Sequence, residues 1–176
     1  MIPRIGSRVA AAVATLALGG VGAVAAQAPA SASSFTATYL CNVPGAGTET
    51  STINASLTAS PNPATSGSTV GFALDVANIS APAPTAINSW NATAVIEGSG
   101  AEISAFKATA SGGSVPAGQP ISNVHMTGSW TPSASGTDKF LIGDITINMD
   151  SASFGNVTVS CTPSGSRPTA GTLTVR

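Results

Sequence analysis

The chain has 176 residues, of which 43% are hydrophobic and only 7% are charged, with a formal net charge of −1. Six lysine and arginine residues in the whole chain exclude a surface of clustered positive charge for nucleic acids or anionic membranes. The length suits one domain with a sizeable core, and the regular recurrence of apolar residues distinguishes the chain from a disordered one.

The first predicted element is a secretory signal peptide at residues 1–32. Two arginines precede an apolar run at residues 9–26, and Ala30-Ser31-Ala32 then supplies the small-x-small pattern of a signal peptidase site. A membrane-anchoring helix is the alternative, but glycines interrupt the run and no basic stop-transfer sequence follows it. The sequence therefore predicts cleavage after Ala32, and one exported domain at residues 33–176 without a membrane-spanning segment.

The rest of the chain alternates short β-like runs with clusters of Gly, Pro and Ser. Within the runs, apolar side chains recur at every second residue, which places them on one face of a strand. Val70, Phe72 and Leu74 show this pattern, with Gly71 and Ala73 between them. In chain order, strands are expected within 35–41, 52–58, 70–76, 87–97, 101–109, 124–130, 145–149, 157–161 and 172–176.

These eight or nine strands, without an amphipathic helix after the leader, indicate an all-β protein. Gly/Pro/Ser clusters between short strands are typical of antiparallel sandwiches. Two sheets packed face to face would bury the apolar faces, so we predict an immunoglobulin-like antiparallel β-sandwich. Strand number alone does not separate this fold from a closed β-barrel, which is the alternative.

Cys41 and Cys161 are the two cysteines of the chain. An even number of cysteines in an exported protein predicts a disulfide, which here would tie the first strand to the penultimate one. A lipid anchor is disfavoured because Cys41 follows the bulky Leu40. Structural zinc usually takes four ligands, and the chain has two cysteines and one histidine. A cysteine nucleophile needs a free thiol, which export disfavours.

The sequence contains no clear catalytic constellation. His125 is the one histidine, and strand alternation predicts that it lies exposed on a sheet rather than acting as a base. Glu97 and Glu102 flank a predicted turn and resemble the carboxylate pair of a glycosidase, but two solvated turn residues are the better interpretation. Phosphate-binding and calcium-loop patterns are absent. We therefore expect no catalytic residue, no metal site and no cofactor.

Four short motifs occur in this chain in an order that a known protein family shares. They are Tyr39-Leu40-Cys41, a turn from Pro61 or Pro63 to Gly67 before Val70, the run from Gly155 to Cys161, and Pro163 and Pro168 before Leu173 and Val175. With them the chain resembles a family of uncharacterised secreted domains, of unknown function, from high-GC Gram-positive bacteria (actinobacteria). The resemblance spans nearly all of residues 34–176. It implies a disulfide-linked β-sandwich, and no activity, ligand or catalytic residue.

The functional prediction follows from these observations. We expect a secreted, non-catalytic protein, extracellular or associated with the cell envelope, that acts as a surface interaction or binding module for an envelope or extracellular partner. The first alternative is a carrier of a small apolar ligand, because a chain rich in Gly and Ala can leave an unfilled interior. The second alternative is a polysaccharide-active enzyme that uses Glu97 and Glu102.

Overall fold

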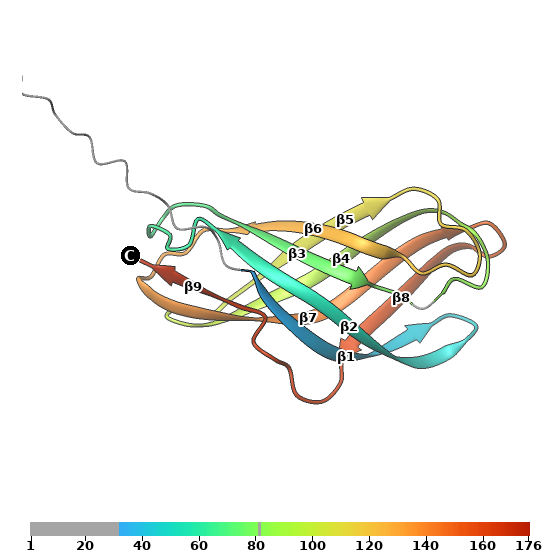
Figure 1. Cartoon of the computed structure of the whole chain (residues 1–176), viewed down its shortest axis with the longest axis horizontal. Helices are drawn as coiled ribbons and strands as arrows, with labels where there is room; N and C mark the ends of the chain where they lie inside the picture. Colours follow the sequence, from blue (N-terminus) through green and yellow to red (C-terminus); the bar gives the residue numbers. More distant parts are fainter. Residues whose placement is uncertain (1–31, 81) are drawn as a thin grey trace, which may run out of the picture.

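The computed structural model describes residues 32–80 and 82–176, so the signal peptide predicted at residues 1–32 lies almost wholly outside the described residues. Nine strands and no helix occur in these two ranges (Figure 1). The strands are β1 (Ser33–Val43), β2 (Gly47–Ser60), β3 (Val70–Asn78), β4 (Ile87–Gly100), β5 (Ser104–Gly112), β6 (Ser122–Trp130), β7 (Gly136–Ser151), β8 (Gly155–Pro163) and β9 (Gly171–Val175). The predicted all-β class and the predicted number of strands are confirmed.

Every pairing between neighbouring strands is antiparallel, in the order β4-β5-β6-β3-β2-β1-β8-β7-β9. β4 also pairs with β7, from Ile87 opposite Ser151 to Gly100 opposite Asp138. This pairing closes the order into a ring of eight strands, with β9 added along β7. Side chains from unpaired strands meet inside the ring, as Phe72 on β3 meets Phe140 on β7. The fold therefore combines the face-to-face packing of a sandwich with the edge-to-edge pairing of a barrel.

The predicted alternation of buried and exposed side chains is present in the strands. On β3, Val70, Phe72, Leu74 and Val76 are buried, whereas Asp75 between them is exposed. The same alternation places the apolar residues of β1, β2, β6, β8 and β9 in one continuous core. Because the side chains of a strand point alternately to its two faces, the hydrophobic effect selects which face is turned inward.

One end of the molecule is filled by large aromatic side chains. The Phe72 ring lies 4.6 Å from that of Phe106 and 4.9 Å from that of Phe140, measured between centroids. Trp130 stacks on Phe106 with 4° between the ring planes and meets Phe140 edge-on. Phe140 pairs with Gly98 near the end of β4, the end at which the C-terminus lies (Figure 1). These contacts leave the opposite end of the ring without comparable filling.

Most strand bounds differ from the predicted ranges by a few residues, and two of these differences bear on the packing of the core. β7 begins at Gly136, well before the predicted 145–149, because Phe140 and Ile142 continue the apolar inner face toward its N-terminal end. β4 runs on to Gly100, since the glycines expected to form a turn remain paired with β5 and β7. A Cβ at Gly98 would collide with the Ser104 hydroxyl and would also crowd the Phe140 ring at 3.0 Å, so this glycine permits the close approach of β4 to β5 and β7.

A candidate apolar ligand cavity

The disulfide lies at the base of the end of the ring that is opposite the aromatic cluster. Cys41 and Cys161 are bonded to each other and are opposite one another in the β1–β8 ladder, which confirms the predicted bridge between the first and penultimate strands. β1 and β8 pair at four positions only, Tyr39–Asn42 with Ser160–Pro163. Beyond Asn42 the β1–β2 hairpin separates from β8, and this divergence opens a space next to the disulfide.

The turn of the β1–β2 hairpin is formed by residues whose backbone preferences suit a tight turn. Pro44 restricts its own φ, and Gly45 has a φ of 83°, the left-handed value that the second central position of a type II turn requires. The Ala46 amide donates to the Val43 carbonyl at 3.0 Å, which closes the turn. Pro44 and Gly45 therefore form the turn that joins β1 to β2.

A cavity of about 710 Å³ lies between the β1–β2 hairpin, the β3–β4 loop and the β7–β8 hairpin. Its buried wall is mostly apolar and consists of Ile79, Ala83, Ile87, Ile147, Val159 and the Cys41–Cys161 disulfide, together with the polar Ser151. Val43, Met149, Val157 and Phe154 continue this lining toward the mouth. The volume falls within the range of about 300–1,000 Å³ that is usual for small-molecule sites.

Backbone hydrogen bonds hold the loops around the mouth. The Ala83 amide donates to Gln119 at 3.0 Å, and the Gly118 amide donates to Ala83 at 2.7 Å, which ties the β3–β4 loop to the β5–β6 loop. The hydroxyls of Thr85 and Ser151 hydrogen-bond at 2.9 Å and join the β3–β4 loop to the end of β7. The side of the mouth formed by the β3–β4 and β5–β6 loops and the end of β7 is therefore preformed, which lowers the entropy cost of binding.

The cavity is almost uncharged. Glu49 is the one charged side chain among the described residues that line it, and it projects from the same face of the hairpin as its register partner Cys41. The other polar groups are hydroxyls and one amide, from Thr50, Ser51, Ser80 and Asn156 among others. A charged ligand would lose hydration here without finding an opposite charge on most sides, so the lining favours an uncharged apolar molecule.

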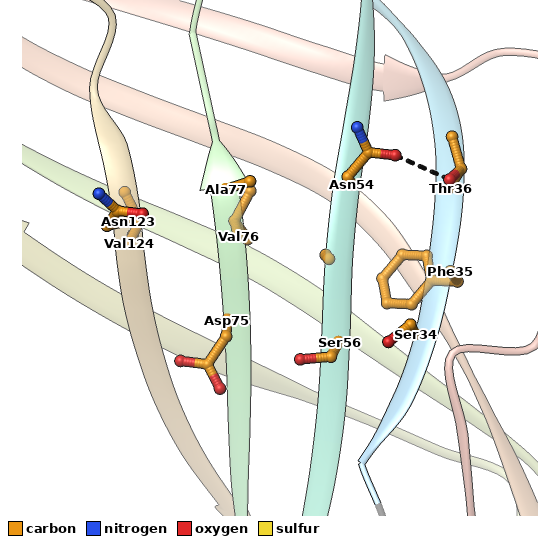
Figure 2. Close-up of a pocket in the computed structure, with 11 residues that line it drawn as sticks. Ser34, Phe35, Thr36, Asn54, Ser56, Asp75, Val76, Ala77, Asn123 and Val124 are labelled. Atoms are coloured by element: carbon orange, nitrogen blue, oxygen red, sulfur yellow. Dashed lines mark hydrogen bonds between the residues drawn. The ribbon is translucent and has the colours of Figure 1, made fainter.

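A second, more open hollow of about 680 Å³ lies over β1, β2, β3 and β6. Figure 2 shows its polar side chains on adjacent strands, with Asn54 beside Thr36 and Asp75 between Ser56 and the β6 strand. The Thr36 hydroxyl donates to Asn54 at 2.8 Å. These side chains belong to the outer, solvent-facing side of the sheet, and the surface that they form is shallow.

His125 is exposed beside this hollow, as predicted. Its Nδ1 lies 2.6 Å from Asp75 Oδ1, and the two side chains are 60% and 54% exposed. Asp75 is the cross-strand partner of His125, so the contact follows from strand register. A contact between two side chains this exposed contributes little to stability.

Glu97 and Glu102 each bind a different group. Glu97 pairs with Arg167 at 2.9 Å, and the Arg167 Nε also donates to the Ile142 carbonyl. Glu102 accepts hydrogen bonds from the Ser133 amide at 2.8 Å and from the Ser133 hydroxyl at 3.0 Å, so it ties the β4–β5 turn to the β6–β7 loop. The bond from the Ser133 backbone is the main reason that the pKa of Glu102 is lowered. Neither carboxylate lines either hollow.

Across residues 32–80 and 82–176, His, Cys, Asp and Glu side chains form no group of three or more that is suited to a metal ion. Within these same ranges, no helix is long and apolar enough to cross a membrane.

Sequence reasoning did not identify the cavity residues. The high content of Gly and Ala indicated an unfilled interior, but not its position. Phe154, 69% exposed at the rim, follows no strand pattern because it occupies the turn between β7 and β8. One signal was available in the sequence: the Pro-rich loop near Ala83 and the Val43-Pro44-Gly45 turn both lack aromatic residues.

Comparisons of the chain with protein-family models, with curated proteins and with solved structures find no match. The site is therefore interpreted from its own geometry and chemistry.

Proposed function

We propose that this protein is an exported, non-catalytic binding domain that holds a small uncharged apolar ligand in the cavity beside the Cys41–Cys161 disulfide. The observation that carries the proposal is the cavity itself, of about 710 Å³, with a buried apolar wall and a single charged group at its lip. The proposal therefore joins two of the predictions from the sequence: the protein is a binding module, and the ligand that it binds is small and apolar.

The driving force for binding is the burial of apolar surface. Removing apolar surface from water contributes roughly 25 cal/mol per Å². A ligand that buries about 250 Å² therefore gains about 6 kcal/mol before its loss of rotational and translational freedom. Hydrogen bonds between the loops restrict movement of the mouth, so less of this gain is spent on ordering the protein.

The proposed location is extracellular or on the cell envelope. The disulfide is compatible with an oxidising compartment, and the predicted signal peptide at residues 1–32 would direct export. We also propose that the protein is related to the secreted domains of high-GC Gram-positive bacteria that it resembles. We propose as well that its sandwich is immunoglobulin-like. We propose no catalytic role, because Glu97 and Glu102 are each engaged in their own contacts.

The test uses protein collected from the medium of an exporting host. We expect its mass to correspond to a chain that begins at Ser33 and contains no free thiol. Titration with the neutral fluorophore N-phenylnaphthylamine should give saturable binding in the micromolar range, and dodecanol should displace the fluorophore. Val157→Phe should weaken this binding at least tenfold, because Val157 lines the cavity and a larger ring there occupies ligand space.

Val95→Phe is the matched control. Val95 is also a partly buried valine on a strand, but it does not line the cavity. Equal probe affinity in the wild type and in Val157→Phe would contradict the proposed site. Absence of saturable binding by any neutral apolar probe would contradict the proposed function.

A further inference from the structure

The inner face of β2 changes from apolar to polar as the strand passes the cavity. Ile53 is buried in the core, Ser51 is half-buried, and Glu49 is exposed. Because side chains at every second residue share one face of a strand, these three point to the same side. Ser51 and Glu49 both line the cavity, and every residue of β2 is described. The strand therefore leads from the apolar core to a polar lip of the cavity.

The pairing of the strands places Glu49 beside the disulfide. Glu49 is opposite Cys41 in the β1–β2 ladder, and Cys41 is opposite Cys161 in the β1–β8 ladder. Directly opposite residues project from the same face with Cβ atoms about 5 Å apart, so the Glu49 side chain starts next to the buried wall. Figure 1 shows the tip of the β1–β2 hairpin apart from β8. Glu49 lies in this part of the hairpin, where its carboxylate stays in contact with solvent.

The charge of Glu49 determines which ligand group can bind at this lip. No ion pair within residues 32–80 and 82–176 involves Glu49, and the other lining residues of these ranges are uncharged. An ionised carboxylate accepts hydrogen bonds and donates none, and hydrogen bonds to it are stronger than those to a neutral acceptor. A ligand group beside Glu49 must therefore donate a hydrogen bond, whereas an anionic group would be repelled.

We propose that the cavity binds a neutral amphiphile, with its apolar chain against the disulfide wall and a hydrogen-bond-donating head group, such as a hydroxyl, on Glu49. This inference rests on the proposed function, because it names the class of ligand that the same cavity takes. Val159 on β8 and Ile147 on β7 also line the cavity, and their buried apolar side chains offer a head group no partner. The ligand is therefore bound in one orientation, with its chain inward and its head group at the lip.

The experiment compares dodecanol, dodecyl methyl ether and dodecanoate, which share one alkyl chain, as competitors of N-phenylnaphthylamine at neutral pH. We expect dodecanol to bind about tenfold more tightly than the ether, because only the alcohol can donate a hydrogen bond to the carboxylate. The ether is the more apolar molecule, so burial of apolar surface alone would favour the ether instead. Dodecanoate should bind most weakly, because its own charge would face Glu49.

Variants of Glu49 test whether this residue sets the selectivity. Glu49→Ala should abolish the preference for dodecanol and leave the affinity for the ether unchanged, which also shows that the variant is folded. Glu49→Gln should strengthen dodecanoate binding severalfold, because it removes the repulsion and supplies an amide donor. Asp150→Asn is the matched control. It removes a carboxylate close to Asn156 at the same end of the molecule, but Asp150 does not line the cavity, so the order of the three ligands should not change.

The outcomes separate this inference from the proposed function. An ether that competes as tightly as dodecanol in the wild type would overturn the head-group assignment, and so would a dodecanol preference that survives in Glu49→Ala. In both cases, saturable binding of N-phenylnaphthylamine leaves the apolar cavity standing. Absence of probe binding in the wild type overturns the cavity, and the head-group assignment with it.

Discussion

At the scale of single residues, Tyr39 connects the sheet to a polar contact in the interior. It is 1% exposed, and its hydroxyl donates to the Ile142 carbonyl at 3.4 Å. Burial is the main cause that raises its pKa to about 12, and it outweighs the opposing effect of the Arg167 charge. The neutral phenol is therefore the form that the folded protein holds.

Tyr39 is the one tyrosine of the chain, so tyrosinate absorbance reports on this residue alone. We expect the absorbance of the native protein to rise near pH 12 and that of the unfolded chain near pH 10. Between these values the unfolded state releases a proton that the folded state retains. Stability is therefore complete below about pH 10 and declines as the pH rises toward 12. Native absorbance that titrates near pH 10 without unfolding would contradict this prediction.

At the scale of elements, the β1–β2 hairpin depends on few neighbours beyond the disulfide. β2 pairs with β3 only from Ala55 onward, and β1 pairs with β8 only as far as Asn42. The tip of the hairpin therefore has neither sheet neighbour. The bond between Cys41 and Cys161 lies one residue before the last pair that attaches the hairpin to β8, Asn42 with Ser160.

Replacing both cysteines by serine should lower the free energy of unfolding by about 4–5 kcal/mol, because the bridge closes a long loop in the unfolded chain. The separation of 120 residues sets this magnitude. Urea denaturation measures it, with Asn42→Ala as a control for altered hairpin contacts. Hydrogen exchange should also become faster in residues 43–51 than in β4. A loss of stability below about 1 kcal/mol would show that the folded state does not depend on the bridge.

At the scale of the whole molecule, the two ends of the ring differ in how they are filled. Phe72, Phe106, Phe140 and Trp130 pack one end, whereas mostly small and β-branched residues surround the cavity at the other, with Met149 and Phe154 toward its mouth. The aromatic cluster fills the interior at its own end, and the smaller side chains leave the cavity at the other. The distribution of aromatic residues along the chain thus decides which end contains the cavity.

This separation predicts independent effects on stability and binding. Phe72→Ala should lower the free energy of unfolding by about 3–5 kcal/mol, since it removes a fully buried ring from the aromatic end. The remaining folded protein should bind N-phenylnaphthylamine with wild-type affinity. Calorimetry and fluorescence titration measure the two quantities. A large loss of affinity in Phe72→Ala would show that the two ends are coupled.

Much of the fold was predictable from local patterns. Alternating residues such as Phe72 and Leu74 identified the buried faces, and the same alternation placed His125 outside. The N-terminal half of β7 was not predicted, because Asp138 and Gly143 interrupt its apolar pattern, yet both are buried. The cavity was anticipated only as a general property of a chain rich in small residues.

The amino-acid sequence by itself determined the strand content, the inward faces and the pairing of Cys41 with Cys161. These features depend on side-chain periodicity and on the number of cysteines, both of which are local or compositional. Only the tertiary structure decided that β4 meets β7 and that the β1–β2 hairpin, the β3–β4 loop and the β7–β8 hairpin gather at one end with the cavity between them. Such features depend on contacts between residues far apart in the chain, whose geometry is set by packing of the whole ring.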